Sequence, residues 1–225
     1  ILFSEKILML NLRNNLAQWY TRMLKRLFDL AMTVFGGLLL SPFLLLLALL
    51  VAVDSRGRVI FAHERVGKDG KHFKCYKFQT MVPDAKERLE EHLRQHPEAR
   101  KEWEETFKLT DDPRVTRLGA FLRRSSLDEL PQLFNILKGD MSIVGNRPLP
   151  LYEAEKLTAD ASIDRFMAPA GLTGLWQVEE RGKGGNMSAE ERKQLDITYG
   201  QTYSFMLDMK IIFRTLTAFV QKENV

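Results

Sequence analysis

The chain has 225 residues, a length that suits one domain, and carries a formal net charge of +4 with 28% charged residues. No basic stripe interleaved with aromatic residues is visible in the sequence, which argues against nucleic acid as a partner. A mildly basic chain with one long uncharged stretch better suits an anionic membrane surface or a phosphate-bearing molecule. The single cysteine, Cys75, excludes an intrachain disulfide.

The uncharged stretch covers residues 30–53 and is long enough, as a helix, to span a bilayer core of about 30 Å. Pro42 follows Ser41 in its middle and removes a backbone donor, so we expect the helix to bend or break there. Basic residues flank both ends, whereas a single crossing predicts a basic flank on the cytoplasmic side only. A kinked spanning helix and a re-entrant helix–break–helix hairpin both fit on physical grounds.

Two further segments follow in chain order. Residues 58–81 alternate loosely around the turn signal Lys68-Asp69-Gly70, which predicts a small β-hairpin. Residues 84–107 are rich in Glu, Lys and Arg, and we interpret them as a solvated helical excursion broken at Pro97. His92 and His96 stand four residues apart there, but their charged neighbours favour a solvated helix face over a metal site.

Apolar residues return at helical spacing between 114 and 137, with arginines interleaved. Such a pattern fits an amphipathic helix in the membrane interface, and equally an ordinary half-buried helix. Residues 203–219 show a similar pattern, which again fits either an interfacial helix or an ordinary half-buried helix.

The stretch 123–131, RRSSLDELP, contains the neighbouring carboxylates Asp128 and Glu129. Ser126 and Glu129 match a capping box, while Pro131 favours a helix start nearer Asp128, and the choice stays open. Either start places both carboxylates in a first helical turn, where acidic residues are common for structural reasons alone. Neighbouring positions on a helix diverge by about 100°, so one carboxylate could face a phosphorus centre while the other holds a divalent cation.

The sequence resembles the monotopic phosphoglycosyl transferases, the bacterial sugar transferase family that begins glycan assembly on polyprenol phosphate. The resemblance covers about 200 residues in order, and the motifs that carry it are Lys25-Arg26-Leu27-Phe28-Asp29, Ser41-Pro42, Arg65-Val66-Gly67, Lys77-Phe78, Asp112-Pro113-Arg114, Ser126-Leu127-Asp128-Glu129-Leu130-Pro131-Gln132-Leu133, Gly139-Asp140-Met141-Ser142, Arg147-Pro148 and Gly171-Leu172-Thr173-Gly174-Leu175-Trp176-Gln177-Val178.

The resemblance implies a two-step transfer of a sugar-1-phosphate from a UDP-sugar to polyprenol (undecaprenyl) phosphate, with release of UMP. Asp128 would be the nucleophile that carries the sugar-phosphate, and Glu129 would bind Mg²⁺. Lys77 matches an active-site lysine of the family. Arg123 and Arg147 match arginines that contact phosphate, for which a guanidinium group is well suited.

Three positions depart from the family pattern. Gln79 stands where the family usually has arginine, so no role is assigned to it. Asn146 replaces a proline before Arg147, and we expect this change to free the preceding backbone. Glu179-Glu180-Arg181 keeps the arginine of a usual x-Gly-Arg sequence, and Arg181 is a candidate nucleotide or phosphate contact beside the glycine-rich Gly182–Gly185.

The resemblance also favours the re-entrant hairpin, with its break at Ser41 and Pro42. The expected fold is α+β and predominantly helical, with that hairpin, amphipathic interfacial helices and a small β-hairpin. We expect an N-terminal segment (1–23), for which the end of an upstream region is one interpretation because the chain starts at Ile1. A membrane helix (24–54) and a cytosolic catalytic domain at the membrane interface (55–225) would follow.

The expected location is the cytoplasmic face of the bacterial inner membrane. Membrane lipid, a second copy of the chain and downstream glycosyltransferases are candidate partners. A catalytically silent scaffold of a glycan-assembly complex and a peripheral lipid-binding protein are the alternative functions. The intact set of Asp128, Glu129, Lys77, Arg123 and Arg147 argues against both.

Overall fold

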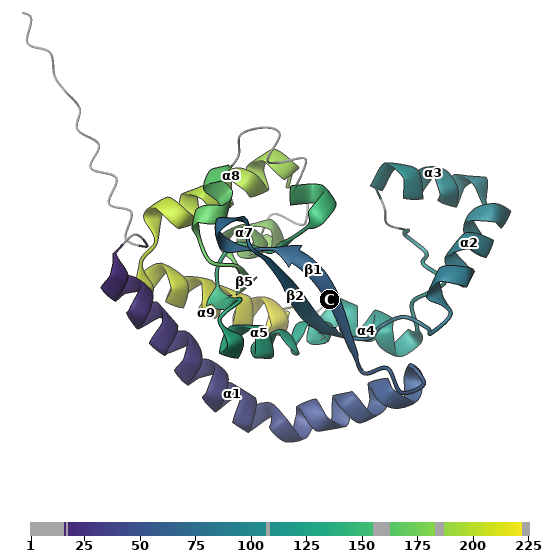
Figure 1. Cartoon of the computed structure of the whole chain (residues 1–225), viewed down its shortest axis with the longest axis horizontal. Coiled ribbons are helices and arrows are strands. Elements are labelled where there is room, and N and C mark those ends of the chain that lie inside the picture. The colour runs from purple at the N-terminus through teal and green to yellow at the C-terminus, as the bar shows by residue number, and fades with distance from the viewer. Residues whose placement is uncertain (1–15, 17, 107–108, 155–162, 183–186, 222–225) are drawn as a thin grey trace, which may run out of the picture. The chain divides into compact units, whose positions relative to one another are not determined.

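The structure, a computed structural model, describes residues 16, 18–106, 109–154, 163–182 and 187–221 (Figure 1). Its α-helices are α1 (Trp19–Asp54), α2 (Ala85–Gln95), α3 (Pro97–Thr106), α4 (Arg117–Ser125), α5 (Gln132–Lys138), α7 (Leu175–Gly182), α8 (Ala189–Thr202) and α9 (Phe205–Gln221). Its strands are β1 (Ile60–Val66), β2 (His72–Phe78), β3 (Ser142–Val144), β4 (Leu149–Pro150) and β5 (Gly171–Thr173), and its 3₁₀ turns are η2 (Lys68–Gly70), η3 (Leu127–Glu129) and η4 (Ile163–Met167).

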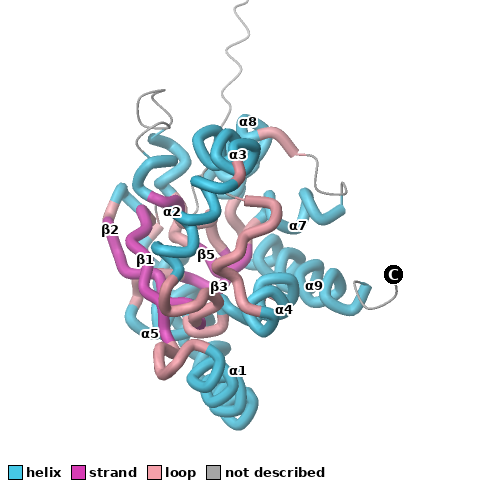
Figure 2. The backbone as a smooth tube through the Cα atoms, turned by 90° about the vertical axis from the view of Figure 1, so that its right-hand side faces the viewer, coloured by secondary structure: helices cyan, strands magenta, loops and turns pink. Residues whose placement is uncertain are grey.

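Helices dominate and the strands are few and short, which confirms the predicted mostly helical α+β class (Figure 2). The chain forms two compact units, which are described separately here. Unit 1 takes its described residues from Ile1–Asp29, Gly67–Lys71 and Ser142–Val225, and unit 2 consists of Leu30–Val66 and His72–Met141.

Helix α1 contains the predicted apolar segment and is the one helix among the described residues that is long and apolar enough to cross a membrane. Only 11% of its most apolar 18-residue window is buried inside the protein, and side chains such as Leu38 and Leu39 are 70% exposed. This exposure, which is unusual for a protein surface in water, associates α1 with a membrane.

The helical backbone of α1 continues through Pro42, in a segment where Figure 1 shows the helix bending. Proline lacks the N–H that would bond the carbonyl four residues earlier, which here belongs to Leu38. The hydroxyl of Ser41 donates to that carbonyl at 2.8 Å. The Ser-Pro pair therefore bends the helix while a side chain replaces the missing backbone hydrogen bond.

In unit 2 the predicted β-hairpin is confirmed, because β1 and β2 pair antiparallel from Ile60–Phe78 to Val66–His72. Its hydrophobic core joins the end of α1 to β2 and α4 through Leu47, Val51, Phe78 and Leu122, all buried. Thr116 caps α4 by accepting a hydrogen bond from the Gly119 N–H at 2.8 Å, and its hydroxyl donates to Asp54 at 2.6 Å. The end of α1 is thus fixed to the start of α4.

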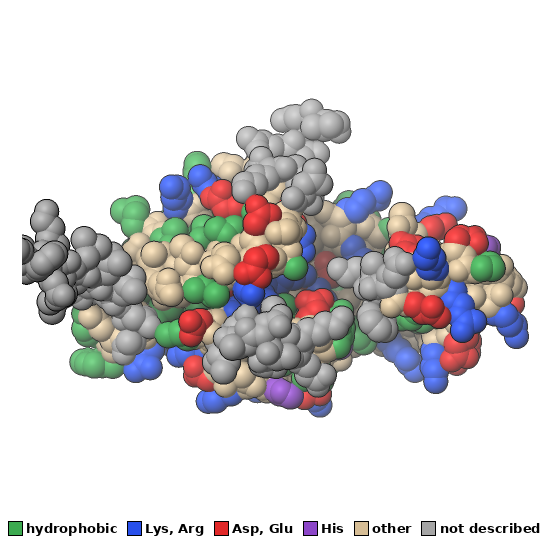
Figure 3. All heavy atoms as spheres, turned by 90° about the horizontal axis from the view of Figure 1, so that it is seen from above, with side chains coloured by type: hydrophobic (Ala, Val, Ile, Leu, Met, Phe, Trp, Pro, Cys, Tyr) green, Lys and Arg blue, Asp and Glu red, His purple; other side chains and the backbone are tan. Residues whose placement is uncertain are grey.

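The charged excursion of unit 2 is also confirmed, as α2 and α3 with a boundary at His96 and Pro97. Acidic and basic side chains are intermixed over these helices, at the right of the space-filling view (Figure 3). Their ion pairs, such as Arg100–Glu104, are exposed. This arrangement is that of a solvated surface.

In unit 1, β3 and β5 pair in parallel through Ser142–Gly171 and Val144–Thr173. The start of α1 is fixed to this unit by buried polar contacts. Lys25 Nζ lies 2.6 Å from Asp208 of α9, and Asp29 accepts hydrogen bonds from the Ser142 hydroxyl and the Ile143 N–H. Lys25 therefore belongs to the protein interior and does not serve as an exposed basic flank.

The two segments with an amphipathic pattern form helices that are half-buried. In α4, Leu122 is fully buried while Phe121 is 51% exposed. In α9, Ile211 is buried while Phe213 and Leu216 are more than 60% exposed.

Candidate active site

The acidic pair Asp128 and Glu129 lies in the 3₁₀ turn η3, between α4 and α5 of unit 2. Placement in a first helical turn is thus confirmed, and of the two helix starts left open, the capping box at Ser126 does not form. Ser126 has a left-handed backbone (φ 57°), and its side chain makes no capping hydrogen bond. It ends α4, whereas α5 begins only at Gln132.

Lys77 of β2 contacts both carboxylates. Its Nζ lies 2.7 Å from Glu129 Oε1 and 3.6 Å from Asp128 Oδ2. The three side chains are mostly buried, with exposed fractions of 20% for Lys77, 10% for Asp128 and 16% for Glu129. Although neighbouring helical positions diverge, one ammonium group therefore links the two acids.

Asn135 of α5 holds the strand that carries Lys77. Its side-chain carbonyl accepts the Tyr76 N–H at 3.0 Å, and its amide donates to the Lys74 carbonyl at 2.7 Å. Asn135 is fully buried. Because α5 follows directly after η3, the same short segment presents the carboxylates and fixes the strand of their lysine partner.

Arg123, at the end of α4, is fixed beside the pair by Thr80. Its Nε donates to Thr80 Oγ1 at 2.9 Å. This contact requires a close approach of the chain to α4 at Gly119, where an added Cβ would lie only 2.1 Å from the Thr80 carbonyl oxygen. No local sequence motif marks Thr80, Gly119 or Asn135, because their roles depend on contacts between distant parts of the chain.

The charges of the site act on one another. Burial raises the pKa of Asp128, and the neighbouring Glu129 adds to this, while Lys77 and Arg123 oppose it. Burial also lowers the pKa of Arg123, whereas the carboxylates of Asp112 and Asp128 act to raise it. Arginine stays protonated even so. Two cations therefore favour the ionised form of this mostly buried aspartate against the effect of its burial.

The Asp112-Pro113-Arg114 motif forms an internal ion pair in the same unit. Arg114 donates to both carboxylate oxygens of Asp112, at 2.8 and 2.7 Å. Burial would raise the pKa of Asp112, but the hydrogen bonds from Arg114 outweigh it and hold that pKa below its usual value. Asp112 is thus an anion whose charge acts on Arg123.

An ionised carboxylate in such a site is suited to attack phosphorus, and the neighbouring cations attract phosphate oxygens. Carboxylate oxygens are also the ligands that Mg²⁺ prefers. Within the described ranges no cluster of three or more His, Cys, Asp or Glu side chains could hold a metal alone.

The remaining predicted arginines belong to unit 1. Arg147 follows β3 and is partly buried. The backbone of Arg181 lies in α7, but its side chain and residues 183–186 of the glycine-rich stretch fall outside the described residues. Gln79, in unit 2, donates its side-chain amide to the Met81 carbonyl at 3.2 Å.

The expectation that Asn146 frees the backbone before Arg147 is wrong. Its N–H donates to the Pro169 carbonyl at 2.9 Å, and its carbonyl accepts the Gly171 N–H at 2.8 Å. Two glycines allow this close pairing of chains, since a Cβ on Gly145 or Gly171 would lie 2.2 Å from backbone atoms opposite.

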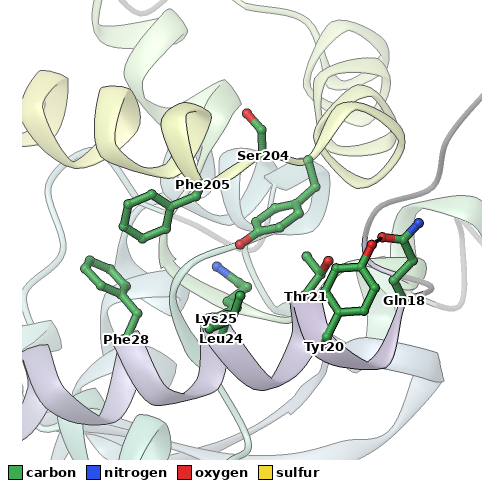
Figure 4. Close-up of a pocket in the computed structure, with 9 residues that line it drawn as sticks. Gln18, Tyr20, Thr21, Leu24, Lys25, Phe28, Ser204 and Phe205 are labelled. Carbon is green, nitrogen blue, oxygen red and sulfur yellow. Dashed lines mark hydrogen bonds between the residues drawn. The ribbon is translucent and has the colours of Figure 1, made fainter.

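A pocket of about 660 Å³ lies in unit 1, at the start of α1. Phe28 and Phe205 face each other in it with their rings edge to face (Figure 4). Lys25 lines the pocket but is paired with Asp208. None of its nine lining residues belongs to the predicted catalytic set.

His92 and His96 stack on one another with ring centroids 4.4 Å apart; His92 is half-buried and His96 is exposed. They form no metal-binding group with other described residues.

Comparison with known proteins gives one family. The family model described as "Bacterial sugar transferase" matches residues 20–222. The chain is 42% identical over 224 residues to the undecaprenyl-phosphate galactose phosphotransferase of Salmonella typhimurium, covering 99% of this chain and 46% of that protein. It is 44% identical over 196 residues to the exopolysaccharide production protein ExoY of Rhizobium meliloti, covering 87% of this chain and 85% of that protein.

A third relative is the UDP-glucose:undecaprenyl-phosphate glucose-1-phosphate transferase of Escherichia coli, 37% identical over 206 residues, with 89% of this chain and 41% of that protein covered. The chain thus spans about half the length of the Salmonella and Escherichia relatives and most of the Rhizobium relative.

Proposed function

Because the chain belongs to the bacterial sugar transferase family, we propose that it transfers a sugar-1-phosphate from a UDP-sugar to undecaprenyl phosphate and releases UMP. The transfer would be the first membrane step in the assembly of a polysaccharide. The observation that carries the proposal is the mostly buried Asp128–Glu129 pair, held by Lys77 and flanked by Arg123.

In the first half-reaction, a carboxylate oxygen of Asp128 attacks the β-phosphorus of the UDP-sugar. A bond forms between that oxygen and phosphorus, the bond from phosphorus to the bridging oxygen breaks, and UMP leaves with the electron pair. Lys77 favours the ionised form of Asp128 against its burial, and Arg123 attracts the phosphate oxygens. Covalent catalysis of this kind divides one difficult displacement into two easier ones.

In the second half-reaction, a phosphate oxygen of undecaprenyl phosphate attacks the same phosphorus. The bond to Asp128 breaks, the carboxylate is restored, and the product is an undecaprenyl diphosphate sugar. The low exposure of the Asp128 side chain, 10%, would limit attack by water on the intermediate.

Glu129 is the proposed residue that holds Mg²⁺. The adjacent carboxylates offer hard oxygen donors, and Mg²⁺ is commonly bound through one or two carboxylates together with substrate phosphates. When bound, the ion would neutralise charge on the diphosphate. Titration of Mg²⁺ into wild-type and Glu129→Gln protein in the presence of UDP-sugar tests this role. A weaker apparent Mg²⁺ affinity in the variant supports it, and identical titrations would refute it.

Arg147 and Arg181 are proposed contacts for the phosphates or the nucleotide of the donor. Loss of such a contact weakens donor binding, so Arg147→Ala and Arg181→Ala should raise the KM for the UDP-sugar. Wild-type kinetics in either variant would remove that residue from the site.

The proposed location is the cytoplasmic face of the bacterial inner membrane, with α1 entering and leaving on that side. The exposed apolar surface of α1 and its bend at Ser41-Pro42 support this course. The test places single cysteines at Trp19 and Val53, both exposed, in a Cys75→Ser background. A membrane-impermeant maleimide should label both in inside-out vesicles and neither in right-side-out vesicles. Labelling of one from each side would show a spanning helix.

The activity itself is tested by incubating the protein with a panel of UDP-sugars, Mg²⁺ and undecaprenyl phosphate, and measuring UMP. We expect UMP release with at least one donor, lost in Asp128→Asn. No release with any donor would instead support the second candidate, a catalytically silent scaffold. The intact charge set around Asp128 speaks against that candidate.

A further inference from the structure

Asn146, immediately before Arg147, binds two distant segments of unit 1 with one side chain. Its amide group donates to the Arg165 carbonyl at 2.7 Å and to the Asp196 carbonyl at 3.1 Å. Arg165 lies in η4 and Asp196 in α8. Together with its two backbone hydrogen bonds, Asn146 is held at four points, and it is almost fully buried.

Arg165 adds a second link from the same segments to Arg147. Its Nη2 lies 2.6 Å from Asp196 Oδ2, in an ion pair whose side chains are 7% and 0% exposed. The same nitrogen is 3.4 Å from the Arg147 carbonyl oxygen. The backbone on both sides of the Arg147 Cα is therefore supported by Arg165, Asp196 and Asn146.

The flanking backbone leaves little freedom to move. Gly145 donates to the Thr173 carbonyl at 2.9 Å, and Gly174 fits against Gly145 so closely that a Cβ there would lie 2.3 Å from the Gly145 carbonyl oxygen. On the other side, Pro148 has a fixed φ. Arg147 thus projects from a short segment that is immobilised before and after it.

The hydrogen bonding of Asn146 is not optimised for stability alone. Its side-chain oxygen is buried and has no hydrogen-bond partner among the described residues. Such an unpaired acceptor is costly, and native proteins rarely keep one without a reason. The amide group of the same side chain reaches two carbonyls at once.

We propose that Asn146 is a positioning residue, which fixes the backbone of Arg147 by joining it to η4 and α8, and that Arg165 supports it through the Arg147 carbonyl. The inference rests on the proposed function, in which Arg147 contacts donor phosphate. In this chain the amide side chain does by hydrogen bonding what a proline at the same position would do by its ring.

The test is a double-mutant cycle on UMP release, with KM for the UDP-sugar and kcat measured separately. Asn146→Ala removes the amide. Arg165→Lys keeps a cation for Asp196 but shortens the side chain, which should weaken the 3.4 Å contact to the Arg147 carbonyl. Each is combined with Arg147→Lys. A displaced phosphate contact should raise KM roughly 10- to 100-fold in Asn146→Ala, with kcat changed less.

The matched control is Lys25→Met, which breaks another buried ion pair of the same unit. Its effect on KM should add to that of Arg147→Lys, because Lys25 is not one of the side chains that hold the Arg147 backbone. In contrast, Asn146→Ala and Arg165→Lys should have little further effect on KM once Arg147 has been changed.

Additive effects of Asn146→Ala and Arg165→Lys with Arg147→Lys would overturn the inference, as would wild-type KM in Arg147→Lys. A parallel loss of melting temperature and kcat at constant KM would show that Asn146 only stabilises the fold. Failure of the proposed function gives a different result, namely no UMP from any donor with the wild-type protein, and the inference would then fail with it.

Discussion

Replacing Lys77 by methionine should move the acid limb of the pH–rate profile to higher pH. Burial already raises the pKa of Asp128, and Lys77 is the cation that opposes this most strongly. Asp128 must be ionised to attack phosphorus, so activity is lost as the pH falls through its pKa. Without the ammonium group that pKa rises further, and the loss begins at a higher pH.

The size of the shift follows from the 3.6 Å between Lys77 Nζ and Asp128 Oδ2. Coulomb's law gives about 1.2 kcal/mol at this distance in bulk water and about 4.6 kcal/mol at an effective dielectric constant near 20. At about 1.4 kcal/mol per pKa unit, these limits correspond to about 0.8 and about 3.4 units. Because the pair is mostly buried but still reached by solvent, we expect a shift of about 1 to 3 units.

The assay is UMP formation without acceptor, so that ionisation of undecaprenyl phosphate does not contribute to the profile. Lys74→Met is the matched control, because this substitution makes the same chemical change at an exposed position of the same strand. Its acid limb should coincide with that of the wild-type protein. An acid limb that stays in place in Lys77→Met, or moves to lower pH, would refute the electrostatic role of Lys77.

Three further predictions concern the framework of the site. Gly119→Ala should lower the free energy of unfolding by about 1–3 kcal/mol, because its Cβ would overlap the Thr80 carbonyl. Gly37→Ala should not lower it, because a Cβ there meets no atom within 4 Å, and thermal melting compares the two variants. Thr116→Val removes the cap of α4 and should cost about 1 kcal/mol in denaturant unfolding, whereas Thr116→Ser keeps both hydrogen bonds; equal losses would contradict the capping role. Asn135→Leu should lower kcat by loosening the strand of Lys77, and unchanged kcat in a stably folded variant would contradict this role.

The parts of this fold that the sequence predicts well are those specified by local pattern. The alternation around Lys68–Gly70 predicts the hairpin, and Pro97 marks the boundary between α2 and α3, because both signals act within a few residues. The sequence left the helix start open between a capping box at Ser126 and a start nearer Asp128, and the capping box does not form. Ser126 adopts a left-handed backbone at the end of α4, and the sequence pattern does not show that the chain reverses there.

The supporting residues of the site could not be predicted for a different reason. Thr80, Gly119 and Asn135 act through contacts with residues far away in the sequence, and no local motif marks them. Asn146 shows the same limit. Its replacement of proline suggests a freer backbone, whereas the carbonyls that it binds lie 19 and 50 residues away.

The most direct test of the account is to look for the covalent intermediate on Asp128. Wild-type protein is mixed with its UDP-sugar donor and Mg²⁺ in a single turnover without undecaprenyl phosphate, and its intact mass and peptides are measured. We expect the mass of one sugar-phosphate on the peptide that contains Asp128, formed together with one equivalent of UMP, and its absence in Asp128→Asn. UMP that forms only when acceptor is present, with no adduct on the protein, would contradict the proposed role of Asp128 as nucleophile.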